Sequence, residues 1–216
     1  LEDHVNLVLD QDFLDIKKIK KKNFSIVVDG INSVGGIAIP YFLNKIGINS
    51  IKEINCNPNG KFAHNPEPIP ENISEICSII KKGNYDIGLV VDPDADRLAV
   101  VDENGSPLGE EYTLVLAVDG YIKSISNEEE KFVVNLSSSI ALEKLVKPNG
   151  FVVERSAVGE INVVDKMNEI GSNLGGEGNG GVILRESHLG RDSLVAVTMV
   201  LNRMSQSKSS LSSIYN

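Results

Sequence analysis

The stretch Ile87-Gly-Leu-Val-Val-Asp92-Pro-Asp-Ala-Asp-Arg97 decides the fold class and contains the first candidate site. Its apolar run, residues 87–91, predicts a buried strand, so three carboxylates at alternate positions begin where that strand ends. Pro93 interrupts strand pairing and Ala95 is small, and together they predict a tight loop. In α/β sheets ligands bind at the carboxyl ends of the strands, which makes this loop a candidate site.

The three carboxylates of this loop favour a hard divalent cation. We predict that Asp92, Asp94 and Asp96 bind Mg²⁺, because magnesium in proteins prefers oxygen ligands. Without a cation, carboxylates this close together repel one another and some of their pKa values rise. Arg97 follows directly, and a guanidinium in that position is predicted to hold a phosphate group beside the metal.

Three other interpretations of the loop remain. A solvated acidic turn is the usual fate of an aspartate cluster. In an EF-hand calcium loop, the three aspartates and Glu103 would stand at ligand positions. However, Arg97 stands where glycine is required, and both flanking segments predict strands and not helices. In a phosphatase with an aspartate nucleophile the sequence would continue differently, and no matching acid pair follows downstream.

Composition limits the class of protein. A chain of 216 residues forms one large domain or two of about 100 residues each. Its net charge of −9 argues against nucleic acid as a general partner, and no stretch approaches the ~20 apolar residues of a membrane span. Cys56 and Cys77 lack metal-type spacing and predict reduced thiols of a cytoplasmic protein. Since residue 1 is not Met, we expect a piece of a longer protein.

The remaining pattern alternates strands and helices in two units. Strands are expected at 24–29, 51–56, 86–91, 98–102, 132–136, 151–154 and 182–184. Helices are expected at 1–22, from the loop 30–36 to about 46, and at 73–82, 110–123, 138–146, 158–170 and 192–204. The polar segment 124–131 is the expected linker. This order predicts an α/β fold, namely two consecutive three-layer α/β/α domains with mainly parallel mixed sheets.

Two glycine-rich segments are further candidates. Gly30–Gly36 links a strand to a helix, where it either binds an anion or forms a tight turn that lets the helix pack closely. Gly175–Gly181 is expected to be a flexible loop, with Glu177 and Asn179 as its hydrogen-bonding side chains. These two side chains suit the vicinal hydroxyls of a sugar, whereas the alternative is an ordinary surface loop.

Taken together, these segments resemble the α-D-phosphohexomutase family of phosphoglucomutases, phosphomannomutases and phosphoglucosamine mutases. The resemblance covers most of the chain, in the family's order. It is carried by Phe24–Gly36, Ala63-His-Asn-Pro-Glu-Pro68, Asp92–Arg97, Val158-Gly-Glu160, Gly175–Gly181 and Gly190-Arg-Asp192.

The resemblance implies that residues 1–125 are the family's second domain, with the metal loop, and that residues 126–216 are its third, with the sugar loop. Mg²⁺ would be held by Asp92, Asp94 and Asp96 together with a phosphoserine from a first domain that is not in this chain. Arg97 would help hold the phosphoryl group. The sugar-binding residues would be Glu177, Asn179, Val158 and Gly159.

The implied activity belongs to the whole enzyme, which interconverts hexose 1-phosphate and hexose 6-phosphate of glucose, mannose or glucosamine. The reaction runs through the phosphoserine and a bisphosphorylated sugar. The isolated chain is expected to be inactive, because the first domain and the phosphate-binding fourth domain are its missing partners. The alternative is a non-catalytic module that binds a sugar phosphate or a metal.

Three positions depart from the family pattern. Asn179 and Gly181 stand where much of the family has Ser and His, and Ala157 stands where a Lys often precedes the Val-Gly pair. The usual proton-transfer residues are therefore missing. The candidates to replace them are His188, Arg185 and Arg191.

Overall fold

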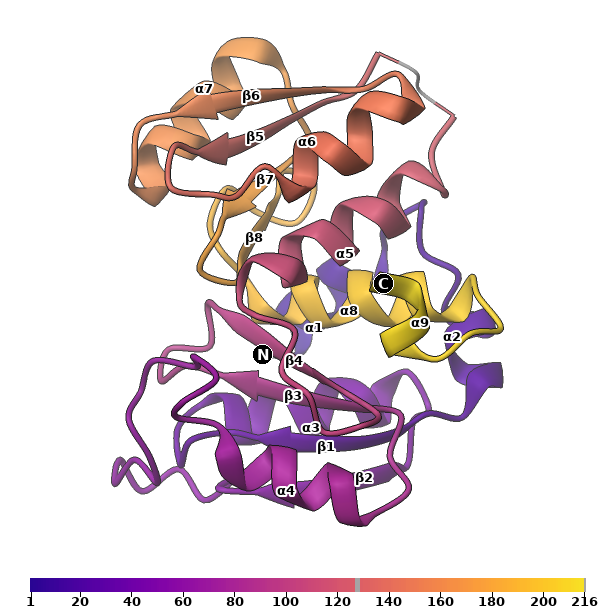
Figure 1. Ribbon diagram of the computed structural model, residues 1–216, viewed down its shortest axis with the longest axis vertical. Coiled ribbons are helices and arrows are strands. Elements are labelled where there is room, and N and C mark those ends of the chain that lie inside the picture. The colour runs from indigo at the N-terminus through magenta and orange to yellow at the C-terminus, as the bar shows by residue number, and fades with distance from the viewer. Residues whose placement is uncertain (127–128, 216) are drawn as a thin grey trace.

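The computed structural model describes residues 1–126 and 129–215. It contains two α/β units, one above the other, with helices α5 (Glu111–Ile122) and α8 (Ser193–Ser205) between them (Figure 1). Each unit has a mixed four-stranded sheet with helices on both faces. The predicted fold class of two three-layer α/β/α domains with mainly parallel mixed sheets is confirmed.

The first sheet has the strand order β2-β1-β3-β4. Its strands are β1 (Ser25–Asp29), β2 (Ser50–Ile54), β3 (Ile87–Val91) and β4 (Leu98–Asp102). The helices of this unit are α1 (Glu2–Leu9), α2 (Ile16–Lys22), α3 (Gly35–Lys45) and α4 (Ser74–Lys82). β1 runs parallel to β2 and β3, whereas β4 is antiparallel to β3. The acidic segment 92–97 is therefore the connection of a β-hairpin at the carboxyl end of β3.

The second sheet repeats this topology in the order β6-β5-β7-β8. Its strands are β5 (Lys131–Asn135), β6 (Val152–Ser156), β7 (Leu174–Glu177) and β8 (Gly181–Leu184). The helices of this unit are α6 (Ala141–Val146), the 3₁₀ turn η1 (Lys147–Asn149) and α7 (Glu160–Ile170). Helix α9 (Leu211–Tyr215) follows α8, and its Ser212 amide donates to Glu103 of the first unit. β7 is parallel to β5 and antiparallel to β8.

One continuous apolar core joins the two units. It extends from Val28 and Leu89 of the first sheet, through side chains of α5 and α8, to Phe132 and Leu184 of the second sheet. Smaller cores lie under α4 and under α7, on the outer faces of the two sheets. Because burial of apolar surface is the main stabilising term, the shared core fixes the position of one sheet edge relative to the other.

The elements differ from the prediction in three places. Residues 1–22 form two helices, because Asp15 caps a second helix through a hydrogen bond from the Lys18 amide. The segment 175–181, predicted to be a flexible loop, instead contains strand β7 and the start of β8. After the last expected helix, 192–204, the structure has a further short helix, α9, whose Leu211 is buried.

The predicted boundary between residues 125 and 126 stays a prediction. α5, which that boundary assigns to the first domain, packs on β4 but also on α6, β7 and β8. The expected linker, 124–131, includes residues 127 and 128, which lie outside the described residues, and its last residue already belongs to β5.

Within residues 1–126 and 129–215, no helix combines the length and the apolar character needed to cross a bilayer. Cys56 and Cys77 are not joined in a disulfide, and both thiols are half-buried.

Candidate functional site

The acidic loop, residues 92–97, begins where β3, which is buried along its whole length, ends at Val91. Asp92 is itself 1% exposed, and its Oδ1 accepts hydrogen bonds from the amides of Asp96 and Arg97, both at 3.1 Å. Ala95 has a φ of 57°, a left-handed conformation that costs energy in any residue with a β-carbon. The turn brings oxygen atoms of Asp92, Asp94 and Asp96 within 4.8 Å of one another.

These carboxylates differ in their proton affinity. Burial raises the pKa of Asp92, but hydrogen bonds from Arg97 outweigh this effect and hold the pKa below its usual value. Burial, together with repulsion from Asp92, raises the pKa of Asp96 to about 6, although Arg191 opposes the shift. Asp94 is exposed. The loop therefore concentrates negative charge that a cation would relieve.

The donor set fits a hard divalent cation. All three candidate ligands are carboxylates, and oxygen donors of this kind suit Mg²⁺. Oδ1 of Asp96 is buried and has no hydrogen-bond partner within the described part of the chain, and the guanidinium of Arg97 approaches it only to 3.8 Å. A buried carboxylate oxygen without a donor is unfavourable, and a bound cation would compensate it.

Arg97, predicted to hold a phosphate, is engaged by carboxylates in this structure. Its Nε lies 2.6 Å from Oδ2 of Asp92, and its Nη1 lies 2.7 Å from Oε2 of Glu67. Burial alone would lower the pKa of Arg97, but the bonds to Glu67 and Asp92 raise it above its usual value. The sequence reasoning missed Glu67, although it lies in the segment 63–68 that carried part of the family resemblance.

The second candidate site centres on Glu177, the last residue of β7. Glu177 is 4% exposed, so its side chain points into the protein. Its Oε1 accepts from Nδ2 of Asn135 at 2.7 Å and from the Gly159 amide at 3.3 Å. Its Oε2 accepts from Nη1 of Arg191 at 2.9 Å and from Nδ2 of Asn179 at 3.4 Å. Donors thus surround both oxygens of the carboxylate.

The glycines of this hairpin serve close packing rather than flexibility, which corrects the prediction of a flexible loop. A β-carbon on Gly176 would lie 2.3 Å from the carbonyl oxygen of Gly181 on the paired strand. Gly180 has a φ of +91°, and a β-carbon there would lie 2.5 Å from the carbonyl oxygen of Leu98. Only glycine permits this approach of the second unit's hairpin to the first unit's hairpin.

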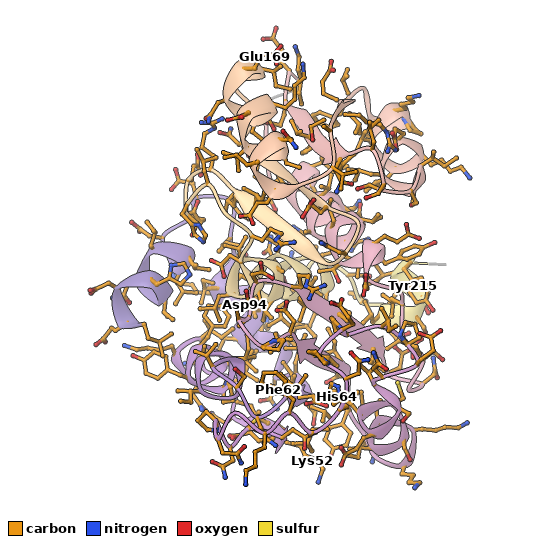
Figure 2. The ribbon with its side chains drawn as sticks, turned by 90° about the vertical axis from the view of Figure 1, so that its left-hand side faces the viewer. Lys52, Phe62, His64, Asp94, Glu169 and Tyr215 are labelled. Atoms are coloured by element: carbon orange, nitrogen blue, oxygen red, sulfur yellow. The ribbon has the colours of Figure 1, made fainter. Side chains whose placement is uncertain are left out.

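The two candidate sites meet at this contact. The Leu98 amide donates to the carbonyl of Gly180 at 3.1 Å, and Arg97 and Gly181 form an isolated antiparallel bridge. Arg191 completes the junction: its Nη2 lies 2.5 Å from Oδ2 of Asp96, and its Nη1 lies 2.9 Å from Oε2 of Glu177. One guanidinium therefore links the acidic loop to the carboxylate of Glu177. Figure 2 shows Asp94 at mid-height of the molecule, between the two units.

The other predicted site residues take up different positions. The Val158 side chain is 61% exposed, and Gly159 contributes its amide to Glu177. Of the three candidates for proton transfer, Arg191 lies at the junction. His188 contacts Asp192, whereas Arg185 donates to the Ser172 carbonyl and to Asn168.

A cavity of about 250 Å³ opens beside the acidic loop, and Asp94, Asp96 and Arg191 are among its lining residues. A larger cavity of about 570 Å³ lies near Lys131 and Val152, at the starts of β5 and β6. The larger one is not at the carboxyl ends of the parallel strands, and we assign the site to the smaller one on that ground.

The first glycine-rich segment, Gly30–Gly36, was expected either to bind an anion or to form a tight turn. A β-carbon on Gly30 would lie 2.3 Å from Cα of Gly36, and one on Gly36 would lie 2.6 Å from Cα of Cys56. These contacts are those of a tight turn that lets α3 pack closely against β1 and β2.

The chain is similar to known proteins over most of its length. Residues 2–105 match the model for "Phosphoglucomutase/phosphomannomutase, alpha/beta/alpha domain II", and residues 109–216 match the model for domain III. A phosphoglucomutase/phosphomannomutase of Thermococcus kodakarensis is 34% identical over 90% of this chain and 42% of its own length. A phosphomannomutase of Methanocaldococcus jannaschii is 31% identical over 97% of this chain and 46% of its own length.

The fold also resembles that of solved structures. A protein of Thermus thermophilus described as a phosphomannomutase superposes with a TM-score of 0.89 at 22% identity, over 99% of this chain and 49% of the other. A phosphoglucomutase/phosphomannomutase family protein of Burkholderia thailandensis gives 0.79 at 23% identity, over 92% and 44%. The chain spans less than half the length of each of these four proteins.

Proposed function

Because this chain belongs to the phosphoglucomutase/phosphomannomutase family and contains its α/β/α domains II and III, we propose that it is the metal- and sugar-binding part of a phosphohexomutase. The parent enzyme would interconvert hexose 1-phosphate and hexose 6-phosphate by way of a phosphoserine and a bisphosphorylated sugar. A cytoplasmic location, predicted from the two unpaired thiols, is part of this proposal.

The observation that carries the proposal is the Arg191 link between Asp96 and Glu177. Phosphoryl transfer to a sugar hydroxyl needs charge stabilisation at the phosphoryl group and orientation of the sugar, within reach of each other. In this protein the cluster suited to a cation and the carboxylate suited to hydroxyls share one guanidinium. A simple solvated acidic turn has no need of that arrangement.

Asp92, Asp94 and Asp96 would hold Mg²⁺, which when bound would offset the negative charge of the transferring phosphoryl group. The side chain of Arg97 already donates hydrogen bonds to two carboxylates, so it would contact a phosphoryl group by releasing the exposed one, Glu67. Asp92 is buried and would keep Nε of Arg97 in place.

Glu177 would orient the sugar by accepting hydrogen bonds from its hydroxyl groups. The carboxylate has about four lone-pair sites, and four donors occupy them in this structure. The two longest contacts, from the Gly159 amide and from Asn179, are the weakest and would yield to sugar hydroxyls. Asn135 and Arg191 would keep the carboxylate in position.

The metal site can be tested on the chain itself. Titration calorimetry with Mn²⁺ and Mg²⁺ is expected to show one weak site, which is lost in Asp94→Asn and kept in Asp165→Asn, a change of an exposed acid on α7. Binding that persists unchanged in Asp94→Asn would exclude the acidic loop.

Turnover needs a separate test, because metal binding alone also fits a non-catalytic module. We expect no conversion of glucose 1-phosphate to glucose 6-phosphate by the 216-residue chain, and conversion by the full-length parent protein. A parent protein that binds Mg²⁺ but converts none of the glucose, mannose or glucosamine phosphates would favour the binding module instead.

A further inference from the structure

A second group of potential metal ligands lies beside the acidic loop and has no part in the function proposed above. His4 of α1 and His188 of the segment before α8 both face Asp192, the residue that precedes α8. Nε2 of His4 lies 2.7 Å from Oδ2 of Asp192, and Nε2 of His188 lies 3.2 Å from the same oxygen. The two imidazole rings are 5.5 Å apart between centroids and are tilted by 59°.

Asp192 is held in a fixed orientation by the start of α8. Its Oδ1 accepts from the amides of Leu194 at 2.8 Å and Val195 at 3.4 Å, so it caps the helix. The side chain is 6% exposed. Oδ2 is therefore the oxygen that remains for the two histidines, and backbone hydrogen bonds of this kind orient metal-ligating carboxylates.

The neighbouring cavity contains polar atoms that lack partners. His4, His188 and Asp192 line the cavity of about 250 Å³ together with Ser193. Ser193 is 1% exposed, and its hydroxyl has no hydrogen-bond partner among the described residues. A buried hydroxyl without a partner is uncommon in folded proteins and indicates a water molecule or ligand at that place.

A purely structural role would use both imidazoles as hydrogen-bond donors to one carboxylate oxygen. That role accounts for the two distances to Asp192, but not for the unpartnered Ser193 hydroxyl. The exposed fractions of His4 and His188, 35% and 43%, leave the outer side of the cluster open to solvent. A three-ligand metal site needs such an open side for a water molecule as fourth ligand.

We propose that His4, His188 and Asp192 form a second metal site, selective for a borderline divalent transition metal of the Zn²⁺ class. Two imidazoles and one carboxylate suit Zn²⁺ and Co²⁺, whereas Mg²⁺ prefers an all-oxygen site. In a tetrahedral zinc site with bonds near 2.0–2.1 Å the ligand atoms lie about 3.3 Å apart. The separations of the two Nε2 atoms from Oδ2 of Asp192, 2.7 Å and 3.2 Å, are shorter than that value, so the His4 side chain would move outward by roughly half an ångström on binding.

Binding has a defined proton balance. Each imidazole must offer a lone pair at Nε2, so the proton that now points at Asp192 moves to Nδ1 or is released to solvent. The metal then replaces two N–H···O contacts with three metal–ligand bonds. Because His4 belongs to α1 and Asp192 to the start of α8, the ion would fasten the first helix of the chain to the second unit.

The test uses the 216-residue chain with saturating Mg²⁺, so that the acidic loop is supplied with its own cation. Co²⁺ is added and followed by its visible absorption, and Zn²⁺ is then added as a competitor. We expect tetrahedral Co²⁺ bands that Zn²⁺ removes. His4→Gln and His188→Gln should each weaken binding by more than the about 10- to 100-fold caused by loss of an outer hydrogen-bond partner.

The sequence offers a matched control. It contains three histidines, and the third, His64, lies on a different loop and contacts Asp29. His64→Gln should keep the Co²⁺ bands, and so should Asp94→Asn, whose side chain belongs to the acidic loop. Asp192 is left unchanged because its loss would also remove the cap of α8.

Two results would overturn the proposal. The first is an octahedral or absent Co²⁺ spectrum in the unchanged chain. The second is loss of the bands in His64→Gln or Asp94→Asn to the same extent as in the His4 and His188 variants. If a Gln variant unfolds, the ¹⁵N chemical shifts of the three histidines in the unchanged chain provide the same test. Zn²⁺ should shift His4 and His188 and leave His64 unmoved.

Discussion

The two sheets have the same topology, but their equivalent hairpins are built in opposite ways. In the first unit the hairpin from β3 to β4 carries three carboxylates on its connection, and side chains determine its properties. In the second unit the hairpin from β7 to β8, here called the glycine hairpin, has five glycines in residues 175–181, and backbone contact determines its position. In the function proposed above, the hairpin with the carboxylates is the charged half of one site, and the hairpin with the glycines is its closely fitting half.

This difference leaves the contact between the two hairpins with carboxylates but without a positive side chain from the second hairpin, and Arg191 supplies that charge. The charged half has a surplus of acids, and the glycine hairpin approaches it closely without supplying a positive side chain of its own. Arg191, two residues before α8, brings the cation to the junction and contacts Asp96, Glu160 and Glu177. We therefore expect the largest effects where this residue or its partners change.

Arg191→Met should cause the largest loss of stability. It leaves Asp96 and Glu177 without their shared cation, and removing one partner of a largely buried pair costs about 3 kcal/mol. Urea unfolding at pH 7 measures the effect, and added Mg²⁺ should restore part of it by neutralising Asp96. Arg185→Met is the control, because Arg185 bonds to a carbonyl and an amide and should cost less. Equal losses in the two variants would contradict the special role of Arg191.

Glu177→Gln should impair the parent enzyme in both directions. The amide keeps the shape of the side chain but weakens charge-assisted bonds, so kcat/KM should fall by roughly 10- to 200-fold, or about 1.4–3 kcal/mol. Steady-state kinetics from hexose 1-phosphate and from hexose 6-phosphate measure it. Phosphorylation of the serine should survive, because the proposed function assigns that step to the acidic loop. An unchanged kcat/KM in both directions would remove Glu177 from the sugar site.

Asp96→Asn should change the free energy of unfolding by less than Arg191→Met does. It should stabilise the metal-free protein, whereas Arg191→Met should destabilise it. The pKa of Asp96 is about 6 in the folded protein and 3.8 as its ordinary value, so ionisation costs folding energy as pH rises through that range. The gain from Asp96→Asn should therefore appear between about pH 4 and 6 and then level off near 1 kcal/mol, a value reduced for partial solvent exposure. Thermal unfolding from pH 4 to 8 measures it, and a gain that shrinks with rising pH would contradict the assignment.

The sequence predicted the hairpin from β3 to β4, with its carboxylates, better than the glycine-rich hairpin from β7 to β8. Asp92, Asp94 and Asp96 follow a continuous apolar strand, so local pattern alone places them at a sheet edge. β7 was missed because Gly175 and Gly176 have low strand propensity, and the reason for glycine there is a neighbouring strand that the sequence does not reveal.

Contacts between distant segments were the least predictable. Glu67 with Arg97, Asn135 with Glu177, and Arg191 with Asp96 join residues that are far apart in the chain. Their pairing depends on how α5 and α8 bring the two units together through a common core, which no local pattern specifies. Arg191 could be named as a candidate because it lies in the resemblance segment 190–192, but its partners could not.

The acidic loop and the glycine hairpin are proposed to form one site around a bound cation. Paramagnetic Mn²⁺, added below stoichiometry to the ¹⁵N-labelled chain, tests it by broadening the NMR signals of nearby amides. We predict broadening of Asp94 and Asp96 and also of Gly180 and Gly181, with sharp signals at Glu169, which Figure 2 shows at the far end of the second unit. All of this broadening should vanish in Asp94→Asn. Broadening that spares Gly180 and Gly181, or that persists in Asp94→Asn, would contradict the claim.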